Sequence, residues 1–358
     1  MATLTNSTFE ELALPQGTTA ERPSSPTIGM LRYNTDLSLL EFFNGGTWRP
    51  VTGYSQGSIG SGGQTVSVAG NSIVHQFTTV GNHTFTPTHT GFVQVLVVAG
   101  GGGPGGSWAG GGGGGGVIFN RAYPVTAGTA YPITVGRGAR RGVREQGNPS
   151  RFTPTLVTTG GGYAGTWDSH TNAGPGGSGG GGGNSSRDSS RLRCHGGNGV
   201  NGQGYPGGSG VRYNDDGTNT HNGGGGGGAG GQGWDSQDEN QQQATHGGPG
   251  VASDILGDIL YWAGGGASGP HICDGGGGDG GVGGGGGGAA HYVPGFPRVG
   301  TGRGGGQSLN QGQPAGNGPP NGNHARYGGD GGANTGGGGG QGNNAHGGGG
   351  SGIVVVRY

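Results

Sequence analysis

Short apolar runs occur mainly toward the two ends of this chain. Residues 29–33, 37–43 and 47–51 alternate apolar and polar side chains around turn-forming residues, which predicts a small β-meander. Similar runs predict further strands at residues 65–68, 72–78, 83–85, 92–99, 117–120, 130–135 and 151–158. The terminal segment 353–358 is too apolar for a loose tail. We expect it to pair in the sheet that carries residues 92–98, because loop-closure entropy grows only logarithmically with length.

Between these apolar ends, glycine is by far the commonest residue. The chain has 105 glycines, and only 27% of its residues are hydrophobic. Such a composition usually gives disorder, because too little apolar surface is buried to offset the entropy of ordering. The question is therefore what could order residues 160–350, in which the longest glycine-rich blocks are 174–184, 223–233, 275–288 and 336–350.

Few ordered structures use so much glycine. Collagen needs a strict Gly-X-Y period with abundant proline, whereas this chain has 19 prolines and unbroken runs such as 111–116. A glycine-serine linker would be a flexible coil. The ordered alternative is a bundle of three-residue helices of the polyproline-II type, whose backbone groups must be satisfied by neighbouring segments. We expect backbone hydrogen bonds to form its core, with non-glycine residues at the surface and in the turns.

These patterns predict a mainly β protein with a polyglycine-II helix bundle. We expect three regions: a β-meander module at 1–53, a β-sandwich platform at 54–159 completed by the strand 351–358, and the polyglycine bundle at 160–350. Polar segments between the glycine blocks should form turns or tip loops. These segments are 163–173, 184–194, 211–222, 234–246, 251–263, 289–299 and 323–327.

The net charge and the absence of lysine exclude several classes of function. The net charge is −1, which gives no electrostatic case for nucleic acid or an anionic membrane. All 17 basic residues are arginine, so a phosphate-binding P-loop, which needs lysine, is excluded. No apolar run approaches the ~18 residues of a membrane span. Residues 1–16 lack the features of a secretory signal, so we expect synthesis in the cytoplasm.

Titratable residues recur in the glycine-rich half without a recognisable ligand spacing. The histidines could form a metal ladder or a pH-sensitive surface, or they could simply hydrogen-bond backbone groups before a glycine run, which we favour. Cys194 and Cys273 allow one disulfide. We therefore predict no metal and no cofactor. The recurrent histidines are His170, His195, His221, His246, His271, His291, His324 and His346.

Acidic and basic clusters are also ambiguous. Asp235, Asp238 and Glu239 form the densest acidic cluster, but neither a glycosidase pair nor a calcium loop is recognisable, so we interpret them as solvated charge. The arginines could bind acidic sugars or phosphates, or lie in solvated loops. We assign no catalytic residue. The larger arginine cluster comprises Arg137, Arg140, Arg141, Arg144 and Arg151, and the smaller one Arg187, Arg191 and Arg193.

Aromatic residues in the polar segments are the best candidates for contacts. A glycine lattice offers them no side-chain core, so they either cover its faces or contact a partner, where Trp and Tyr dominate binding energy. The most apolar of these segments is DILGDILYW at 254–262. The predicted receptor or subunit contacts are Trp167, Tyr213, Trp234, Ile255, Tyr261, Trp262, Tyr292, Phe296 and Tyr327.

The N-terminal sequence resembles an anchoring module of bacteriophage virion structural and tail-fibre proteins. The resemblance rests on TTAERP at 18–23, GMLRYN at 29–34, LEFFN at 40–44 and GTW at 46–48. It implies attachment to other virion proteins. The residues that would serve it are Arg22, Met30, Tyr33, Phe42 and Trp48.

The remainder resembles glycine-rich β-domains of phage and marine-virus proteins, through FVQVLVVAGGG at 92–102, YPITVG at 131–136, SRF at 150–152 and GSGIVVVRY at 350–358. Its alternating blocks are also similar to the polyglycine-sandwich adhesins of T-even-like phages. The resemblance implies a non-enzymatic fibre or adhesin, usually a homotrimer, that presents loops to a host cell-surface protein or glycan. The alternatives are a capsid-decoration or filament-forming virion protein and, third, a fibre that carries a sugar hydrolase.

Overall fold

The structure divides the chain into two compact units, Met1–Ile59 and Gly60–Tyr358. The regions predicted as platform and bundle thus lie in one unit. Almost all regular structure is β, and the helix found among the described residues is the short 3-10 turn η1 (Thr19–Glu21). This computed structural model describes residues 14–37, 39–51, 60–69, 72–106, 109–166, 172–184, 193–215, 218–236, 244–269, 276–290, 301–316, 327–343 and 345–358.

The N-terminal unit is the expected small sheet. Its strands lie in the order β1-β2-β3-β4; β3 is antiparallel to both β2 and β4, and β1 is parallel to β2. The strands are β1 (Gln16–Gly17), β2 (Leu31–Asn34), β3 (Leu39–Phe43) and β4 (Trp48–Pro50).

This small sheet buries polar rather than apolar side chains. Along β2, Leu31 and Tyr33 are exposed, whereas Arg32 and Asn34 are buried. Glu41 lies opposite Arg32 in β3 and is also buried. The alternation expected of a half-buried strand is present, but its apolar face is the one turned to solvent.

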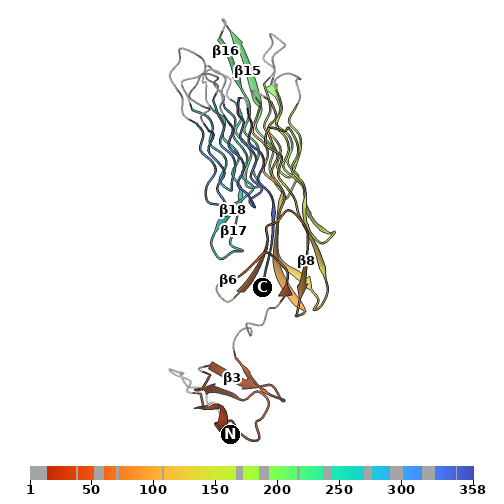
Figure 1. Cartoon of the computed structure of the whole chain (residues 1–358), viewed down its shortest axis with the longest axis vertical. Coiled ribbons are helices and arrows are strands. Elements are labelled where there is room, and N and C mark those ends of the chain that lie inside the picture. The colour runs from red at the N-terminus through yellow and green to blue at the C-terminus, as the bar shows by residue number, and fades with distance from the viewer. Residues whose placement is uncertain are drawn as a thin grey trace, which may run out of the picture. The chain divides into compact units, whose positions relative to one another are not determined.

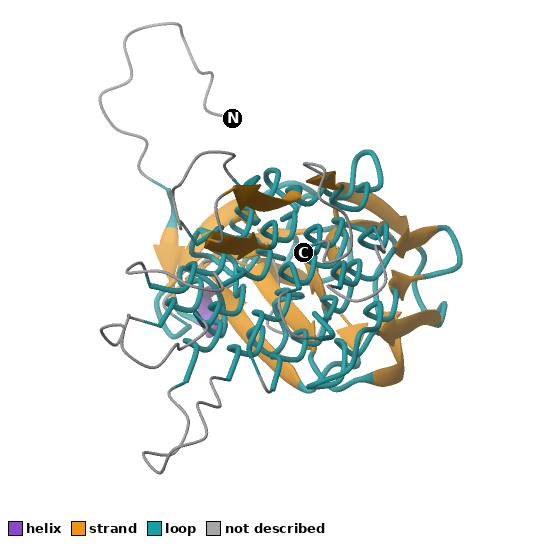
Figure 2. Cartoon of the chain, turned by 90° about the horizontal axis from the view of Figure 1, so that it is seen from above, coloured by secondary structure: helices purple, strands orange, loops and turns teal. Residues whose placement is uncertain are grey.

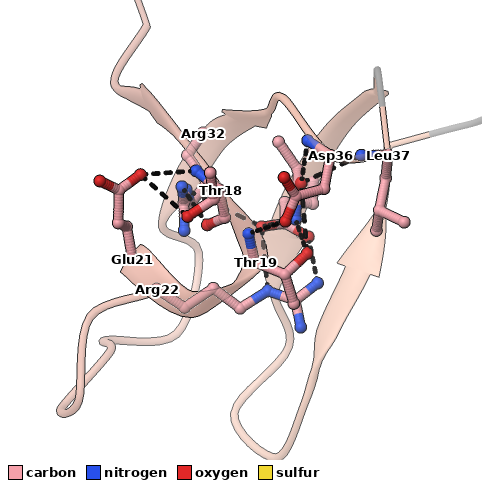
Figure 3. A network of polar contacts seen from close by, with 9 residues as sticks. Thr18, Thr19, Glu21, Arg22, Arg32, Asp36 and Leu37 are labelled. Carbon is pink, nitrogen blue, oxygen red and sulfur yellow. Dashed lines mark hydrogen bonds and ion pairs between the residues drawn. The ribbon is translucent and has the colours of Figure 1, made fainter.

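A hydrogen-bonded network satisfies most of this polar interior (Figure 3), and Nη1 of Arg32 is the atom of the described network that is buried without a hydrogen-bond partner. Glu41 pairs with the guanidinium of Arg22, with Nη2 at 2.6 Å from Oε2 and Nε at 3.1 Å from Oε1. The amide of Asn34 donates to Oε1 of Glu41 at 3.2 Å. Hydrogen bonds from Arg22 hold the pKa of Glu41 below its usual value, against the burial that would raise it. The unit thus depends on a charged network, which contributes little net stability compared with an apolar core.

Two five-stranded sheets form one end of the second unit (Figure 1). Their orders are β10-β9-β19-β7-β6 and β13-β12-β11-β8-β5. Most of these strands were expected from their apolar runs. The strands are β5 (Gly60–Ser61), β6 (Thr65–Ala69), β7 (Ser72–Phe77), β8 (Gly81–Pro87), β9 (Gly91–Val98), β10 (Val117–Val125), β11 (Tyr131–Val135), β12 (Ser150–Phe152), β13 (Leu156–Thr158) and β19 (Ile353–Arg357).

The central strands β9 and β19 are buried on both faces, which explains their nearly continuous apolar sequence. On one face, Val95, Val97 and Val354 pack with Phe85 and Phe152 of the second sheet. The opposite face belongs to a second apolar cluster. That cluster contains Val74, Leu96, Val98, Val117, Ala229, Ile255, Trp262, Ala263, Ile353 and Val355.

The C-terminal strand closes the unit as its sequence predicts. β19 inserts between β9 and β7, antiparallel to both. Beyond it, the Tyr358 hydroxyl lies 2.6 Å from Nε2 of buried His75, whose Nδ1 lies 2.6 Å from the Gly62 carbonyl oxygen. Because a carbonyl only accepts, Nδ1 carries the proton and Nε2 accepts from Tyr358. Burial lowers the pKa of His75, which favours this neutral ring, and raises the pKa of Tyr358 to about 12.

The glycine segments extend from these sheets and lie side by side, as the end-on view of Figure 2 shows. Their backbone hydrogen bonds follow a three-residue period. Along segment 110–116, N–H groups that are three residues apart donate to carbonyl groups of the same neighbouring segment. The donor–acceptor pairs are Gly111–Gly224 and Gly114–Gly227, Gly112–Gly339 and Gly115–Gly336, and Gly113–Gly162 and Gly116–Thr159, at 2.8–3.0 Å.

The carbonyl groups of the same segment accept from three other segments, through Gly102, Ser178 and Gly266 among others. Main-chain groups therefore satisfy one another across the lattice, as expected. Glycine is required by this close approach. A Cβ atom at Gly113 would lie closer than 3.0 Å to the carbonyl oxygen of Ser178, and the other glycines of segment 110–116 face similar overlaps.

The lattice also holds non-glycine residues inside, contrary to the expectation that they would lie only at its surface and turns. Ser178, Thr335, Gln341 and Ala289 are almost completely buried. Gln341 accepts a hydrogen bond from the Gly269 N–H at 3.0 Å, so a longer side chain is accommodated where it replaces a backbone acceptor.

Two segments expected to be loops are hairpins instead. Segment 211–222 forms β15 (Gly210–Asp215) and β16 (Thr218–Asn222), extended on one side by β14 (Arg193–Cys194). Segment 251–263 forms β17 (Val251–Ser253) and β18 (Leu260–Trp262). In Figure 1 the β15–β16 hairpin lies at the end of the glycine segments remote from β6 and β8.

We predict that Gly113→Ala destabilises the second unit by about 3 kcal/mol or more, because the new methyl group must displace backbone on its neighbour. Thermal unfolding of the full chain measures the effect. The matched control is Gly306→Ala, where no atom lies within 4 Å of the added Cβ and φ is ordinary. Its stability should change by less than about 0.5 kcal/mol. Equal effects of the two substitutions would contradict the close packing described.

Candidate binding surfaces

The predicted contact residues separate into five groups, of which the buried pair Ile255 and Trp262 is described below. Trp234 is 57% exposed. Tyr261 and Tyr327 are half-buried, and the Tyr261 N–H donates to the Gln307 carbonyl at 2.7 Å. Tyr213 lies in β15 opposite Thr220. Trp167, Tyr292 and Phe296 lie outside the described residues.

Ile255 and Trp262 are core residues, not surface contacts. Both are 0% exposed and pack with Leu96, Val98 and Val355 against the outer face of the β9–β19 sheet. Contrary to expectation, an aromatic residue thus finds a side-chain core here, because the β17–β18 hairpin packs against the β9–β19 sheet. The hairpin tip remains open, and Ile259 is 70% exposed.

Trp234 lies on the side of the lattice within a set of polar groups. Its ring meets the His246 ring edge-on, with centroids 4.8 Å apart. Nδ1 of His246 accepts from the Asp279 N–H at 2.9 Å. Tyr205, which was not among the predicted contact residues, is 49% exposed on a neighbouring segment. Its sequence position, as a single aromatic residue between glycine runs, could have marked it as a contact candidate.

Side-chain oxygens on the lattice surface accept hydrogen bonds from backbone donors at its edge. Asp235 Oδ1 accepts from Ser209 N at 2.6 Å, and Asp279 Oδ1 accepts from Arg303 N at 2.7 Å. Asp330 Oδ1 accepts from Gly348 N at 2.7 Å. At these positions, therefore, the acidic residues complete the hydrogen bonding of the backbone in addition to carrying charge.

The arginines of the larger cluster make hydrogen bonds, ion pairs and a ring contact within the protein. Glu145 accepts from Arg137 Nη1 at 2.7 Å and from the backbone N–H of Arg140, also at 2.7 Å. These hydrogen bonds, led by the one from Arg137, lower the pKa of Glu145 to about 2. Arg144 stacks on the Tyr163 ring at 4.3 Å, and Arg141 pairs with Asp330 at 3.3 Å. These internal contacts engage guanidinium groups that an anion site would need, and they hold the arginines more closely than the solvated loop of the second alternative would. Arg187 and Arg191 lie outside the described residues.

The described histidines of the lattice fit the backbone-bonding interpretation in two cases. His246 accepts from the Asp279 N–H, and Nδ1 of His346 accepts from the Gly342 N–H at 3.3 Å. Burial lowers the pKa of His346. Within the described ranges, no group of three or more His, Cys, Asp or Glu residues gathers as metal ligands would. Cys194 is a buried free thiol, and Cys273 lies outside the described residues.

The predicted anchoring residues lie in two places in the N-terminal unit. Tyr33 and Met30 are 39% and 40% exposed, and half-buried Phe42 pairs with exposed Leu31 on the same outer face. Arg22 instead belongs to the Glu41 network. The Trp48 ring lies 5.9 Å from the Arg32 guanidinium. The exposed apolar side chains of Leu31 and Tyr33 thus lie on the outer face, opposite the buried polar network.

In the part of the chain that the structure describes, no helix has the length and apolar character needed to cross a bilayer. A family profile described as a glycine-rich domain matches residues 78–320, more than half of the chain. The protein therefore belongs to this glycine-rich domain family. No curated protein matches the sequence.

We predict that Glu145→Gln lowers the free energy of unfolding by about 1–2 kcal/mol at pH 7. This value is smaller than the pKa shift alone implies, because solvent screens the partly exposed arginines. The carboxylate pKa is depressed by folding, so its stabilisation is present above about pH 4.5 and is lost as the pH falls toward 2. Thermal unfolding of both proteins from pH 7 to pH 2 should show the difference shrinking. Asp254→Asn, whose exposed pair with Arg121 spans 3.9 Å, is the control and should change little. A difference that stays constant with pH would contradict the assignment.

Proposed function

We propose that this chain is a non-enzymatic fibre or adhesin protein of a bacteriophage particle. Its N-terminal module would attach to other virion proteins, and its glycine-rich unit would present loops to a host cell-surface protein or glycan. The observation that carries the proposal is the lattice of backbone hydrogen bonds, in which glycine carbonyls and N–H groups of different segments satisfy one another. Because main-chain groups make most of the contacts in this scaffold, its connecting loops are free to vary.

The three-residue hydrogen-bond period supports a polyglycine-II conformation for the segments, since three residues make one turn of that helix. We propose that these helices form a bundle and that the two five-stranded sheets, which share an apolar core, serve as a β-sandwich platform. Loops on a stiff scaffold bind with little loss of conformational freedom.

The N-terminal unit supports attachment through its outer face. A four-stranded sheet with a polar interior is poorly stabilised alone, and its exposed apolar side chains gain stability when a partner covers them. We propose a homotrimer at the surface of the virion, assembled after synthesis in the host cytoplasm. The proposal assigns no catalytic residue, cofactor, nucleic acid or membrane insertion.

The same outer face supports a second candidate function, a capsid-decoration or filament-forming protein whose loops contact sister subunits. Leu31, Tyr33 and Leu37 are between 39% and 52% exposed in one small unit, which suits an interface between subunits.

Replacing the connecting segments separates the two candidates. In the phage that carries this chain, segments 167–171, 237–243 and 291–300 are each exchanged for glycine-serine sequences of equal length. We expect at least one exchange to reduce adsorption to host cells tenfold or more while particles still assemble, because contacts at the host are lost. Adsorption assays and electron microscopy provide the measurements.

The matched control exchanges residues 127–129 in the β10–β11 turn and should leave adsorption unchanged. Failure of assembly with the loop exchanges would favour the structural candidate. Normal adsorption of all three variants would contradict the adhesin proposal.

A further inference from the structure

Two exposed aromatic side chains belong to the glycine lattice itself and lie outside the three exchanged segments, although Trp234 comes three residues before segment 237–243. Trp234 is 57% and Tyr205 49% exposed. Their backbone carbonyls serve the lattice, accepting from Gly225 N at 2.9 Å and Gly179 N at 3.0 Å. A lattice of glycine needs neither ring. Their large apolar surfaces are therefore available for a partner.

Tyr205 and Trp234 lie on neighbouring segments whose backbones are in a defined register. Gly233 N donates to Pro206 O at 3.2 Å, and Ser236 N donates to Ser209 O at 2.9 Å, so the segments run parallel. In this register Trp234 is two residues further along than Tyr205, an axial offset of about 6 Å at ~3.1 Å per residue. On the other side, Trp234 N donates to His246 O at 3.2 Å. We call Tyr205, Trp234 and His246, on three successive segments, the aromatic ridge.

Polar groups beside the aromatic ridge are held in fixed positions. The Ser209 N–H donates to Oδ1 of Asp235 and so orients its carboxylate. The Arg303 N–H does the same for Oδ1 of Asp279. Because the Asp279 N–H donates to Nδ1 of His246, a neutral His246 ring carries its proton on Nε2 and can donate outward. Exposed Asp235 and Asp279 supply acceptors, and exposed Arg303 supplies donors.

This combination suits a sugar better than other ligands. A pyranose ring presents a flat C–H face, which stacks on an aromatic ring, and an edge of hydroxyl groups, which bond to carboxylates and imidazole. Two carboxylates against one guanidinium disfavour phosphate, sulfate or acidic sugars. The axial offset of the two residues along their neighbouring segments suits an extended chain of sugars that crosses the segments.

We propose that the aromatic ridge binds a neutral glycan of the host cell surface, with Trp234 and Tyr205 stacking on sugar rings and Asp235 accepting from a hydroxyl. This inference rests on the proposed host-binding function and narrows it to one class of receptor. It also places a binding surface on the side of the lattice, in addition to any contact made by its loops.

The test is binding of the full chain to an array of neutral, sialylated and sulfated oligosaccharides. We expect binding to a subset of the neutral ones. Trp234→Ala should weaken that binding at least tenfold and Tyr205→Ala at least threefold. Asp235→Asn keeps the Oδ1 acceptor for Ser209 N, so the fold is preserved, and should weaken binding about threefold.

The matched control is Phe92→Ala, which removes an aromatic ring that is 71% exposed in β9, and it should leave affinity unchanged within about twofold. Thermal unfolding checks that each variant is folded. Absence of glycan binding, binding confined to acidic glycans, or full affinity in folded Trp234→Ala and Asp235→Asn would each overturn the inference.

Binding of labelled chain to host cells separates this inference from the proposed function. If cell binding is abolished by protease but not by periodate, which oxidises sugars, the receptor is a protein; the glycan inference then fails and the adhesin proposal stands. If the chain binds neither glycans nor cells, both fail.

Discussion

Backbone-to-backbone hydrogen bonding between glycine segments is the constraint on which the second unit depends. Segment 110–116 donates to three neighbouring segments in a three-residue rotation and accepts from three others. Each of those bonds requires main chains to approach more closely than a Cβ atom permits, as the predicted overlap at Gly113 illustrates. The large entropy lost on ordering glycine is therefore opposed by satisfied polar groups in place of buried apolar area. Ordinary hydrophobic packing has a smaller role here than in most domains of this size.

That role is concentrated where the lattice meets the sheets. Strands β9 and β19 carry apolar side chains on both faces, so one sheet contributes to two cores. Trp262 and Ile255 of the β17–β18 hairpin complete the second core. Because β19 comes last in the chain, this strand ties the end of the glycine-rich region to the start of the unit, and the Tyr358–His75 contact fixes it further.

Much of this architecture is predictable from sequence because runs of β-branched residues indicate strands whatever the tertiary surroundings. Most strands of the two sheets and the return of residues 353–358 follow from that signal, whereas β5 (Gly60–Ser61) carries no apolar residue and was not predicted. The β15–β16 hairpin lacks an apolar run, and the signal its sequence does carry is the Asp216-Gly217 pair between the two strands, a dipeptide that also occurs in loops. The burial of Trp262 could not be foreseen either, because it depends on the position of the lattice against the outer face of β9. In the N-terminal unit, the inward position of Glu41 follows from its pairing with Arg22, which the alternation of residues does not reveal. The exposed Trp234 was identified from its residue type, whereas Tyr205 joins it only through the register of neighbouring segments.

Amide hydrogen–deuterium exchange of the full chain tests the central claim most directly. If main-chain bonds hold the lattice, the N–H groups of residues 110–116, 224–229 and 264–268 exchange as slowly as those of β9 and β19. Exchange of these glycines at the rate of an unstructured peptide, while β9 and β19 stay protected, would contradict the account.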